Sequence, residues 1–307
     1  WRFNSDYCRQ IYEDLQPPVS PSSMWNSSEV RPLEGFVFSV TPFNFSSIAG
    51  NLPSSAAIMG NTGVWKPSRN SYLSNYYLMR LMMDAGLPDG VINFIPGKAS
   101  MVGDICLSHP MLAGIHFTGS TSVFRQMWKD VANNLANLRS YPRIVGETGG
   151  KDFIVAHPNC DQKALTVALI RGAFEYQGQK CSAASRAYIP ESVWNAISDD
   201  YVSEVSKISV GDPKDFSNFM GAVIDRKSFD NIAGYIDRAT QDSGCEIITG
   251  GKYDDSTGYF VQPTTILCSD PNYETMAEEI FGPVLSIYIY PDHEFHETLT
   301  LCDNTSE

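Results

Sequence analysis

The chain has 307 residues, 43% hydrophobic and 19% charged, which is enough apolar material for two domains with separate cores. Its formal charge of −13 argues against nucleic-acid binding, which requires clustered Lys and Arg. No apolar run reaches the roughly 18–20 residues that span a bilayer, so no membrane segment is expected.

The first half of the chain alternates short apolar runs with segments of helical periodicity. Residues 17–23, rich in Pro and Ser, read as an extended connector. The helix expected over 120–138 has Phe124, Met127 and Val131 on one face, at a period of about 3.6 residues. In chain order, the pattern predicts strands at 35–40, 62–66, 91–95 and 114–117, and helices at 48–59, 71–85, 100–108 and 120–138.

A second alternating set begins at Gly149. It predicts strands at 153–156, 185–189, 245–249, 260–267 and 284–290, and helices at 161–176, 191–205 and 226–241. Alternation of this kind implies an α/β fold with parallel sheets and helices on both faces. Ligands bind such sheets at the carboxyl ends of the strands. Residues at predicted strand ends are therefore candidates for a binding site: Thr41, Lys66 and 117–120.

The seven cysteines are scattered at positions 8, 106, 160, 181, 245, 268 and 302, without a Cys-x-x-Cys pair. None has a zinc-ligand spacing with any of the five histidines, so we expect no metal site. An odd number of unclustered cysteines indicates thiols in a reducing compartment.

Cys181 is the strongest nucleophile candidate. It lies in Gly178-Gln179-Lys180-Cys181-Ser182, where small neighbours leave the sulfur accessible and the Lys180 charge favours the thiolate. Glu147, in Gly146-Glu147-Thr148-Gly149-Gly150-Lys151, offers a carboxylate that could act as a general base. The alternative is structural, because most unpaired cysteines are small buried hydrophobes and a glycine-flanked glutamate is often a turn residue.

Other polar residues stand at places that suit ligand binding. The Gly-x-Gly-x-x-Gly fingerprint of dinucleotide sites is absent, but residues 119–123 form a strand-to-helix junction whose open N–H groups suit a phosphate. Asn44, between two phenylalanines, is either a turn residue or an amide aimed at an oxyanion. Lys66 and Glu279 have plain alternatives as a solvated lysine and a carboxylate of an acidic surface cluster.

Taken together, these motifs resemble the aldehyde dehydrogenase superfamily. The segments that carry the resemblance are Pro42-Phe43-Asn44-Phe45, Gly146 to Lys151, Gly178 to Cys181, and Glu278-Glu279-Ile280-Phe281-Gly282-Pro283. The resemblance implies a Rossmann-like cofactor domain over 1–148 and a catalytic domain over 149–307. Because members continue in both directions, it also implies that both domains are incomplete at the chain ends. A loop that anchors the substrate carboxylate is then expected beyond Glu307.

The resemblance also implies roles for single residues. Cys181 would be the nucleophile, Glu147 the base that activates water, and Asn44 the oxyanion donor, with Phe45 and Lys180 near the substrate. Phe124 stands where many members have glycine, and Arg69 where many have glutamate, which leaves the preference for NAD over NADP open. The residues expected to bind the cofactor, NAD, are Thr41, Lys66, Ser68, Gly119, Ser120, Thr121, Ser122, Val123, Glu279 and Phe281.

Within the superfamily, four segments resemble the branch that oxidises L-glutamate γ-semialdehyde to L-glutamate in proline catabolism: 31–36, 41–45, 141–143 with 146–152, and 174–186. Phe43 replaces a tryptophan common elsewhere in the superfamily, and Lys180 is typical of this branch. The implied partners are a small aldehyde and, in the full-length protein, further copies of the same chain. The implied compartment is the mitochondrial matrix in a eukaryote and the cytoplasm in a bacterium. Two alternatives stay open: another aldehyde dehydrogenase, including a CoA-acylating one, and a truncated homologue that binds dinucleotide without turnover.

Overall fold

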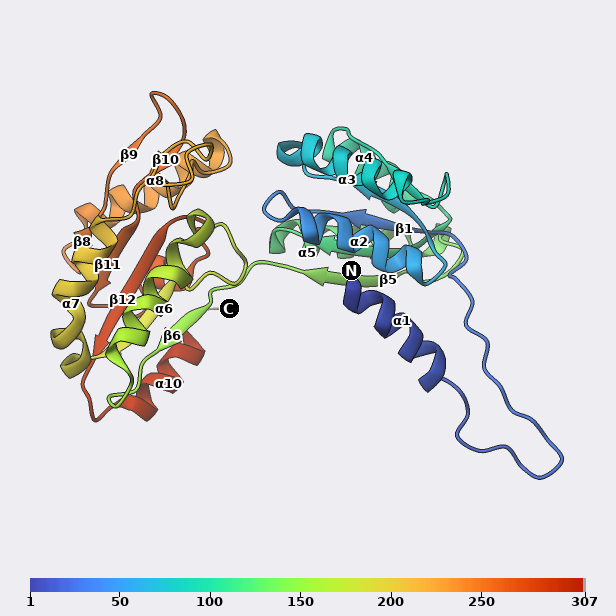
Figure 1. Ribbon diagram of the computed structural model, residues 1–307, viewed down its shortest axis with the longest axis horizontal. Coiled ribbons are helices and arrows are strands. Elements are labelled where there is room, and N and C mark those ends of the chain that lie inside the picture. Colours follow the sequence, from blue (N-terminus) through green and yellow to red (C-terminus); the bar gives the residue numbers. More distant parts are fainter. Residues whose placement is uncertain (306–307) are drawn as a thin grey trace. The chain divides into compact units, whose positions relative to one another are not determined.

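The computed structural model describes residues 1–305, and the chain divides into two compact units, Trp1–Thr148 and Gly149–Glu307 (Figure 1). Residues 306 and 307, at the end of the predicted catalytic domain, lie outside the described residues. The roles assigned to the two predicted domains stay predictions.

The first unit is built on a parallel sheet with the strand order β3-β2-β1-β4-β5. The chain starts in the middle at β1, builds outward to β3, and then returns to the other side of β1 to add β4. This reversal between β1 and β4 is a topological switch point, where doubly wound sheets bind ligands. The strands are β1 (Phe36–Val40), β2 (Thr62–Lys66), β3 (Ile92–Phe94), β4 (Leu112–Thr118) and β5 (Arg143–Glu147).

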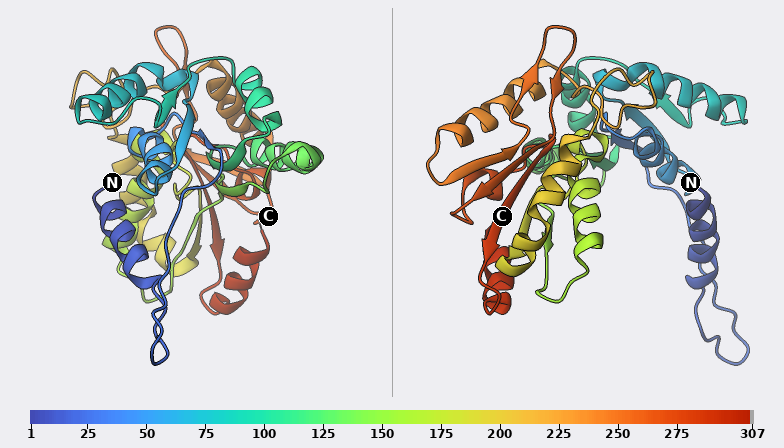
Figure 2. Two further views of the ribbon diagram at one scale, coloured as in Figure 1. Left: turned by 90° about the vertical axis from the view of Figure 1, so that its right-hand side faces the viewer. Right: turned by 60° about the vertical axis from the view of Figure 1, so that its left-hand side comes forward.

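Helices cover both faces of this sheet. One core combines Trp65 and Ile92 with side chains of α2 (Ser46–Ile58) and α3 (Tyr72–Asp84). The other combines the strands with α4 (Ala99–Ser108) and α5 (Thr121–Asn134). The first helix, α1 (Arg2–Asp14), contacts α2 through an Asn4–Asn51 hydrogen bond of 2.7 Å, and the loop after it extends away from the sheet (Figure 2). Short 3₁₀ helices are η1 (Arg69–Ser71) and η2 (Leu135–Asn137).

The second unit has a sheet of order β6-β7-β12-β11-β8, parallel except for the antiparallel edge strand β8. Tyr188, Leu285 and Ile287 in its central strands are fully buried. A small β9–β10 ribbon lies outside this sheet. The strands are β6 (Phe153–Val155), β7 (Arg186–Pro190), β8 (Cys245–Thr249), β9 (Tyr253–Asp254), β10 (Phe260–Val261), β11 (Thr264–Cys268) and β12 (Val284–Tyr290).

Two separate cores lie on the faces of the second sheet. One is formed with α6 (Gln162–Phe174) and α7 (Glu191–Ser206), which lie side by side. The other is formed mainly with α8 (Arg226–Gln241), which contributes Phe229, Ile232 and Ile236. The remaining helices are η3 (Glu175–Gly178), α9 (Glu274–Ala277) and α10 (Phe295–Asn304).

The predicted α/β class with parallel sheets is confirmed, but several element predictions are wrong in detail. The strand predicted over 260–267 is two strands, because Gln262-Pro263 interrupts it between β10 and β11 and Pro has no N–H for a ladder. The helix predicted over 161–176 ends at Phe174, and the one predicted over 120–138 ends at Asn134. Among the strands and α-helices, α1, β5, β9, α9 and α10 were not predicted.

Candidate active site

In the first unit, the candidate cofactor residues gather at the carboxyl ends of the strands. Thr41 follows β1 and is buried; its hydroxyl accepts a hydrogen bond of 2.9 Å from the Trp65 indole, and its N–H donates to the Lys66 carbonyl at 3.2 Å. These contacts fix Thr41 beside the end of β2. The structure thus brings Thr41 and Lys66 together at the carboxyl ends of β1 and β2.

Lys66 is a buried lysine whose charge is satisfied locally. Its Nζ donates to the Pro67 carbonyl at 2.5 Å and lies 3.5 Å from the Tyr72 hydroxyl, over the ring of that tyrosine. Ser68 follows, half-buried, as the residue that precedes η1, and Arg69 is exposed.

The junction of β4 and α5 is the start of a helix, where the sequence predicts a phosphate site. Ser120 is extended (φ −71°, ψ 142°) and, among the described residues, its side chain does not cap the helix; its Oγ lies 3.4 Å from Ser122 Oγ. The first backbone N–H groups of α5 therefore remain available to a phosphate, which the positive end of the helix dipole also favours. Gly119 precedes this turn, and Thr121, Ser122 and Val123 form the first turn of α5.

Phe124, in the first turns of α5, packs on side chains and backbone of β4 and β5. Its ring stacks on Phe117 with centroids 5.4 Å apart, and it covers Gly146 on β5 so closely that a Cβ there would overlap the ring. A side chain at position 146 would therefore force the Phe124 ring to move. The contact fixes α5 against the strand that carries Glu147.

Glu147 is the last residue of β5 and is exposed. It pairs in register with Thr118 on β4, and its carbonyl accepts from the Gly119 N–H at 3.2 Å. The predicted base and the predicted phosphate loop are thus joined by a backbone hydrogen bond. Asn44, the predicted oxyanion donor, is buried in the loop between β1 and α2, next to Phe45, which precedes the first turn of α2. Both residues belong to the first unit, whereas Cys181 belongs to the second.

Cys181 lies in a half-buried turn between η3 and β7. The backbone before it is unusual: Tyr176, Gln177 and Gly178 have φ of 56°, 57° and 63°. Left-handed conformations cost free energy in residues with a Cβ, and strained residues of this kind cluster at functional sites. At Gly178 a side chain is also excluded sterically, because a Cβ would overlap the Gly282 carbonyl.

Hydrogen bonds from several elements hold this loop in place. The Gln179 Oε1 accepts from the Ile224 N–H at 2.9 Å, and Gln179 is itself buried. On the other side, the Ala184 N–H donates to the Gly172 carbonyl at 2.9 Å, and the Ser185 N–H to the Asp152 carbonyl at 3.1 Å. These contacts fix the backbone on both sides of Cys181, as a reactive side chain requires.

The Lys180 charge is paired within the same loop. Its Nζ is 2.5 Å from Glu175 Oε2, and Arg171 is 2.5 Å from the other oxygen of that carboxylate. The hydrogen bond from Lys180 is the main cause that lowers the pKa of Glu175. The positive charge that Lys180 lends to Cys181 is consequently smaller than the sequence suggested.

Glu279 differs from its acidic neighbours in what it contacts. Glu274 pairs with Arg238 and Glu278 accepts from the Tyr235 hydroxyl, whereas Glu279 Oε1 accepts from the Gly150 N–H at 3.2 Å. A Cβ on Gly149 would overlap the Glu279 carboxylate, so the absence of a side chain at position 149 leaves room for this carboxylate. Burial of the carboxyl raises the pKa of Glu279, and the Gly150 hydrogen bond partly opposes this.

Phe281, two residues later, has a φ of 57°. It precedes Gly282, whose carbonyl lies against Gly178. The structure thus places the predicted ribose-binding segment beside the loop that carries Cys181.

Lys151 lies near the predicted base in the sequence, and its motif predicts no role for it. It is buried, and among the described residues its Nζ has no hydrogen-bond partner. Burial lowers the pKa of Lys151 to about 7, and repulsion from the Arg186 charge is the second-largest cause of this shift. The position of Lys151 directly after Gly149-Gly150 was the only feature of the sequence that could have marked it. Its burial is visible only in the fold.

Within residues 1–305, no group of three or more His, Cys, Asp and Glu side chains is placed to hold a metal ion. None of the helices that the structure describes is long and apolar enough to cross a membrane.

The chain is similar to known proteins in both sequence and fold. Residues 1–306 match the aldehyde dehydrogenase family. The chain belongs to this family.

Relatives within the aldehyde dehydrogenase family have more specific names. The mitochondrial delta-1-pyrroline-5-carboxylate dehydrogenase of Dictyostelium discoideum is 50% identical over 307 residues, which is 99% of this chain and 55% of the relative. The human protein of the same name is 45% identical over 100% of this chain and 54% of its own length. The chain spans about 55% of the Dictyostelium relative's length.

A solved structure is similar over the same span. The Delta-pyrroline-5-carboxylate dehydrogenase of Mycobacterium tuberculosis bound with NAD has a TM-score of 0.92 and 49% identity, and the match covers 98% of this chain and 55% of that one. A 1-pyrroline-5-carboxylate dehydrogenase from Thermus with bound NAD has a TM-score of 0.82 and 29% identity, over 89% and 52% of the two chains.

Proposed function

We propose that this chain catalyses the NAD-dependent oxidation of L-glutamate γ-semialdehyde to L-glutamate in proline catabolism. The semialdehyde is in equilibrium with Δ1-pyrroline-5-carboxylate. The observation that carries the proposal is the 50% identity with a delta-1-pyrroline-5-carboxylate dehydrogenase over 99% of this chain. Cys181, Glu147 and Asn44 are all present, and Cys181 lies in a strained, firmly anchored loop.

The proposed mechanism assigns one task to each of these residues. The Cys181 thiolate attacks the aldehyde carbon, and the Asn44 amide donates a hydrogen bond to the oxygen that becomes negative. NAD, held by the residues named in the next paragraph, would supply the acceptor for the hydride that leaves this carbon. The product on Cys181 is a thioester, and Glu147 removes a proton from the water that hydrolyses it to the carboxylate.

The residues proposed for the cofactor fit a dinucleotide. The start of α5, from Gly119 to Val123, offers N–H groups to the pyrophosphate, and the switch point between β1 and β4 is where such ligands bind. Thr41, Lys66 and Ser68 would contact the adenosine side. Glu279 would accept from the nicotinamide ribose in exchange for the Gly150 N–H, with Phe281 packing nearby.

Two residues are proposed to contact the substrate. Phe45, in the loop before α2, would pack on its aliphatic part. Lys180 would favour an anionic substrate over a neutral one, although Glu175 competes for its charge.

The test is to mix the purified chain with NAD and glutamate semialdehyde and follow NADH absorbance. We expect turnover in the wild type and its loss in Cys181→Ser, while NAD still binds, because the proposed cofactor contacts are other residues. Cys160→Ser, another half-buried cysteine, is the matched control and should keep activity. NADH formation by Cys181→Ser at the wild-type rate would refute the assignment.

The same assay separates the alternatives. A CoA-acylating enzyme would need CoA for turnover and would tolerate loss of Glu147. A homologue that only binds dinucleotide would bind NAD without forming NADH. A different aldehyde dehydrogenase would prefer another aldehyde over glutamate semialdehyde.

Compartment and assembly are further parts of the proposal. The Dictyostelium and human relatives carry the word mitochondrial in their names, which supports the mitochondrial matrix for a eukaryotic source; a bacterial source would place the protein in the cytoplasm. We also propose that the full-length protein forms a homo-oligomer. Fractionation of the source cells and light scattering of the full-length protein test these two points.

A further inference from the structure

Two cysteines outside the proposed catalytic site face each other across the edge of the second sheet. Cys245 begins the edge strand β8 and Cys268 ends β11, and the two are partners in the antiparallel register. Side chains of directly opposed residues lie on the same face of a sheet. The two thiols therefore project together.

The ladder places this pair at a position of close approach. The next pair along, Ser269 and Gly244, is joined by a hydrogen bond of 2.9 Å from the Ser269 N–H to the Gly244 carbonyl. Because hydrogen-bonded and non-hydrogen-bonded pairs alternate in antiparallel ladders, Cys245 and Cys268 form a non-hydrogen-bonded pair. Such pairs have Cα atoms about 4.5 Å apart, within the range of about 4.4–6.8 Å that a disulfide spans.

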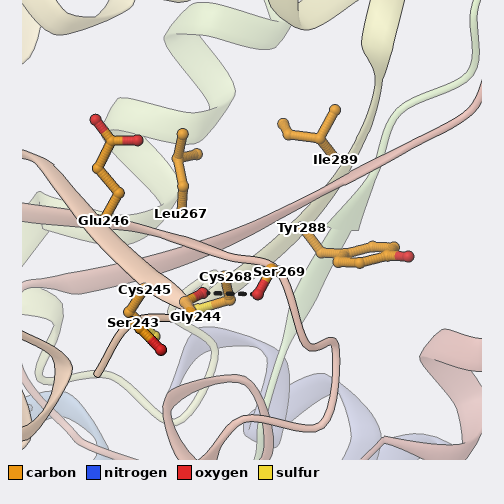
Figure 3. Close-up of a pocket in the computed structure, with 9 residues that line it drawn as sticks. All are labelled: Ser243, Gly244, Cys245, Glu246, Leu267, Cys268, Ser269, Tyr288 and Ile289. Atoms are coloured by element: carbon orange, nitrogen blue, oxygen red, sulfur yellow. Dashed lines mark hydrogen bonds between the residues drawn. The ribbon is translucent and has the colours of Figure 1, made fainter.

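One of the two cysteines can be reached from solvent. Both line a hollow of about 490 Å³ at the end of β8 and β11, together with Ser243, Ser269 and Tyr288 (Figure 3). Cys245 is half-buried, whereas Cys268 is 4% exposed. A small reagent in the hollow would thus meet Cys245 first, with Cys268 behind it.

The surroundings of the two thiols keep them protonated. Burial is the main cause that raises the pKa of Cys245 to about 12 and also raises that of Cys268. Each thiol also shifts the pKa of the other through a side-chain hydrogen bond, so the sulfurs are direct neighbours. On its inner side, Cys268 Sγ lies 3.7 Å from Thr275 Oγ1.

We propose that Cys245 and Cys268 form a dithiol site that a low-molecular-weight disulfide, such as oxidised glutathione, converts into a cross-strand disulfide. The Cys245 thiolate attacks the glutathione disulfide and releases one glutathione as a mixed disulfide forms. The Cys268 sulfur then displaces the second glutathione. The two protein thiols lose two electrons and two protons, and oxidised glutathione becomes two glutathione thiols.

The disulfide would join the edge strand β8 to the interior of its sheet. β8 is the antiparallel edge strand and has one neighbour in this sheet, so its end can open without disturbing the rest. We expect amide hydrogen exchange in β8 to be slower in the oxidised chain than in the reduced one. The high pKa values make the exchange slow at neutral pH and faster in mildly alkaline buffer.

The test is to treat the folded chain with oxidised glutathione in mildly alkaline buffer, block remaining thiols, digest it without reductant and analyse the peptides by mass spectrometry. We expect a linked pair of peptides that contain Cys245 and Cys268, two hydrogens lighter than their sum, which dithiothreitol separates. A second readout is phenylarsine oxide, which binds two neighbouring thiols with release of water. The folded chain should bind it in a form that dithiothreitol reverses and a monothiol does not.

Variants supply the controls. Cys245→Ser and Cys268→Ser should each abolish both the linked peptide and the dithiol-type binding of phenylarsine oxide. Cys302→Ser, a buried cysteine of the same unit, should leave both unchanged. Recovery of Cys245 as a stable mixed disulfide with glutathione, or of both residues as unmodified thiols after prolonged treatment, would overturn the proposal. Mapping on the wild type does not depend on the folding of any variant, and the result is independent of aldehyde oxidation.

Discussion

Two residues with side chains, Tyr176 and Gln177, hold left-handed backbone angles just before the proposed nucleophile. Each costs of order 1 kcal/mol or more, which other contacts must offset. The buried Gln179 and its hydrogen bond to Ile224 supply part of this stabilisation. The sequence predicted the reactive cysteine from its neighbours, but composition alone gives no signal for this strain.

At the same scale, Glu147→Gln should separate the two halves of the proposed reaction. Acylation of Cys181 needs only a thiolate, whereas hydrolysis needs a base, so we expect a burst of about one NADH per site followed by slow turnover. Stopped-flow absorbance measures the burst. Glu29→Gln makes the same substitution at an exposed residue of the same unit and should behave as the wild type. Absence of both burst and thioester would instead place Glu147 in activation of the thiol.

Lys151 should make stability depend on pH. Burial lowers its pKa from the ordinary 10.5 to about 7, so between these values the folded chain has released a proton that the unfolded chain still holds. Stability then rises with pH across this window, by at most about 1.4 kcal/mol per pH unit. Thermal unfolding of the wild type and Lys151→Met, compared from pH 7 upward, should show this rise in the wild type alone. Lys163→Met, at an exposed lysine of the same unit, is the control and should keep the wild-type slope.

At the scale of elements, the contact of α5 with β5 depends on the absence of a side chain at Gly146. Gly146→Ala would place a methyl group in the Phe124 ring, and we expect a loss of about 1–3 kcal/mol in stability. Adding Phe124→Ala should recover part of the loss caused by the first change. Gly103→Ala in α4 is the matched control, because a Cβ there meets nothing within 4 Å. Equal melting temperatures of Gly146→Ala and the wild type would contradict the packing argument.

Elements with clear periodicity or an unbroken apolar run were predictable, and the others had specific reasons to be missed. The helix α1 exposes Phe3, Tyr7 and Ile11 to solvent and contains no buried residue, so its pattern does not mark a core face. The strand β5 contains charged and glycine residues and is mostly exposed. Its position is decided by pairing with β4, which is a long-range contact that no local pattern encodes.

At the scale of the whole molecule, each described core cluster draws its residues from one unit only. Ile115→Ala in β4 and Ile287→Ala in β12 each remove a fully buried side chain and should cost about 2–5 kcal/mol. We expect each change to increase amide exchange mainly in its own unit. Equal increases in both units after either change would show that the chain unfolds as one cooperative body.

The sequence names more of the candidate site's residues than it does details of the fold, because those residues lie in short motifs. Motifs name residues but not their partners, and the pairing of Lys180 with Glu175 and the burial of Lys151 both arise from folding. Glycines illustrate the difference: Gly149 and Gly178 look alike in the sequence. The structure shows that one makes room for the Glu279 carboxylate and the other for the Gly282 carbonyl.

The backbone contact between Gly178 and Gly282 has a thermodynamic consequence. It joins the loop of the proposed nucleophile to the segment proposed to bind the nicotinamide ribose, so neither can shift without displacing the other. Coupling between two binding events is reciprocal: if NAD changes the affinity of Cys181 for a reversible thiol ligand by some factor, that ligand changes the affinity for NAD by the same factor. The cysteine loop would then report the presence of cofactor before any aldehyde arrives.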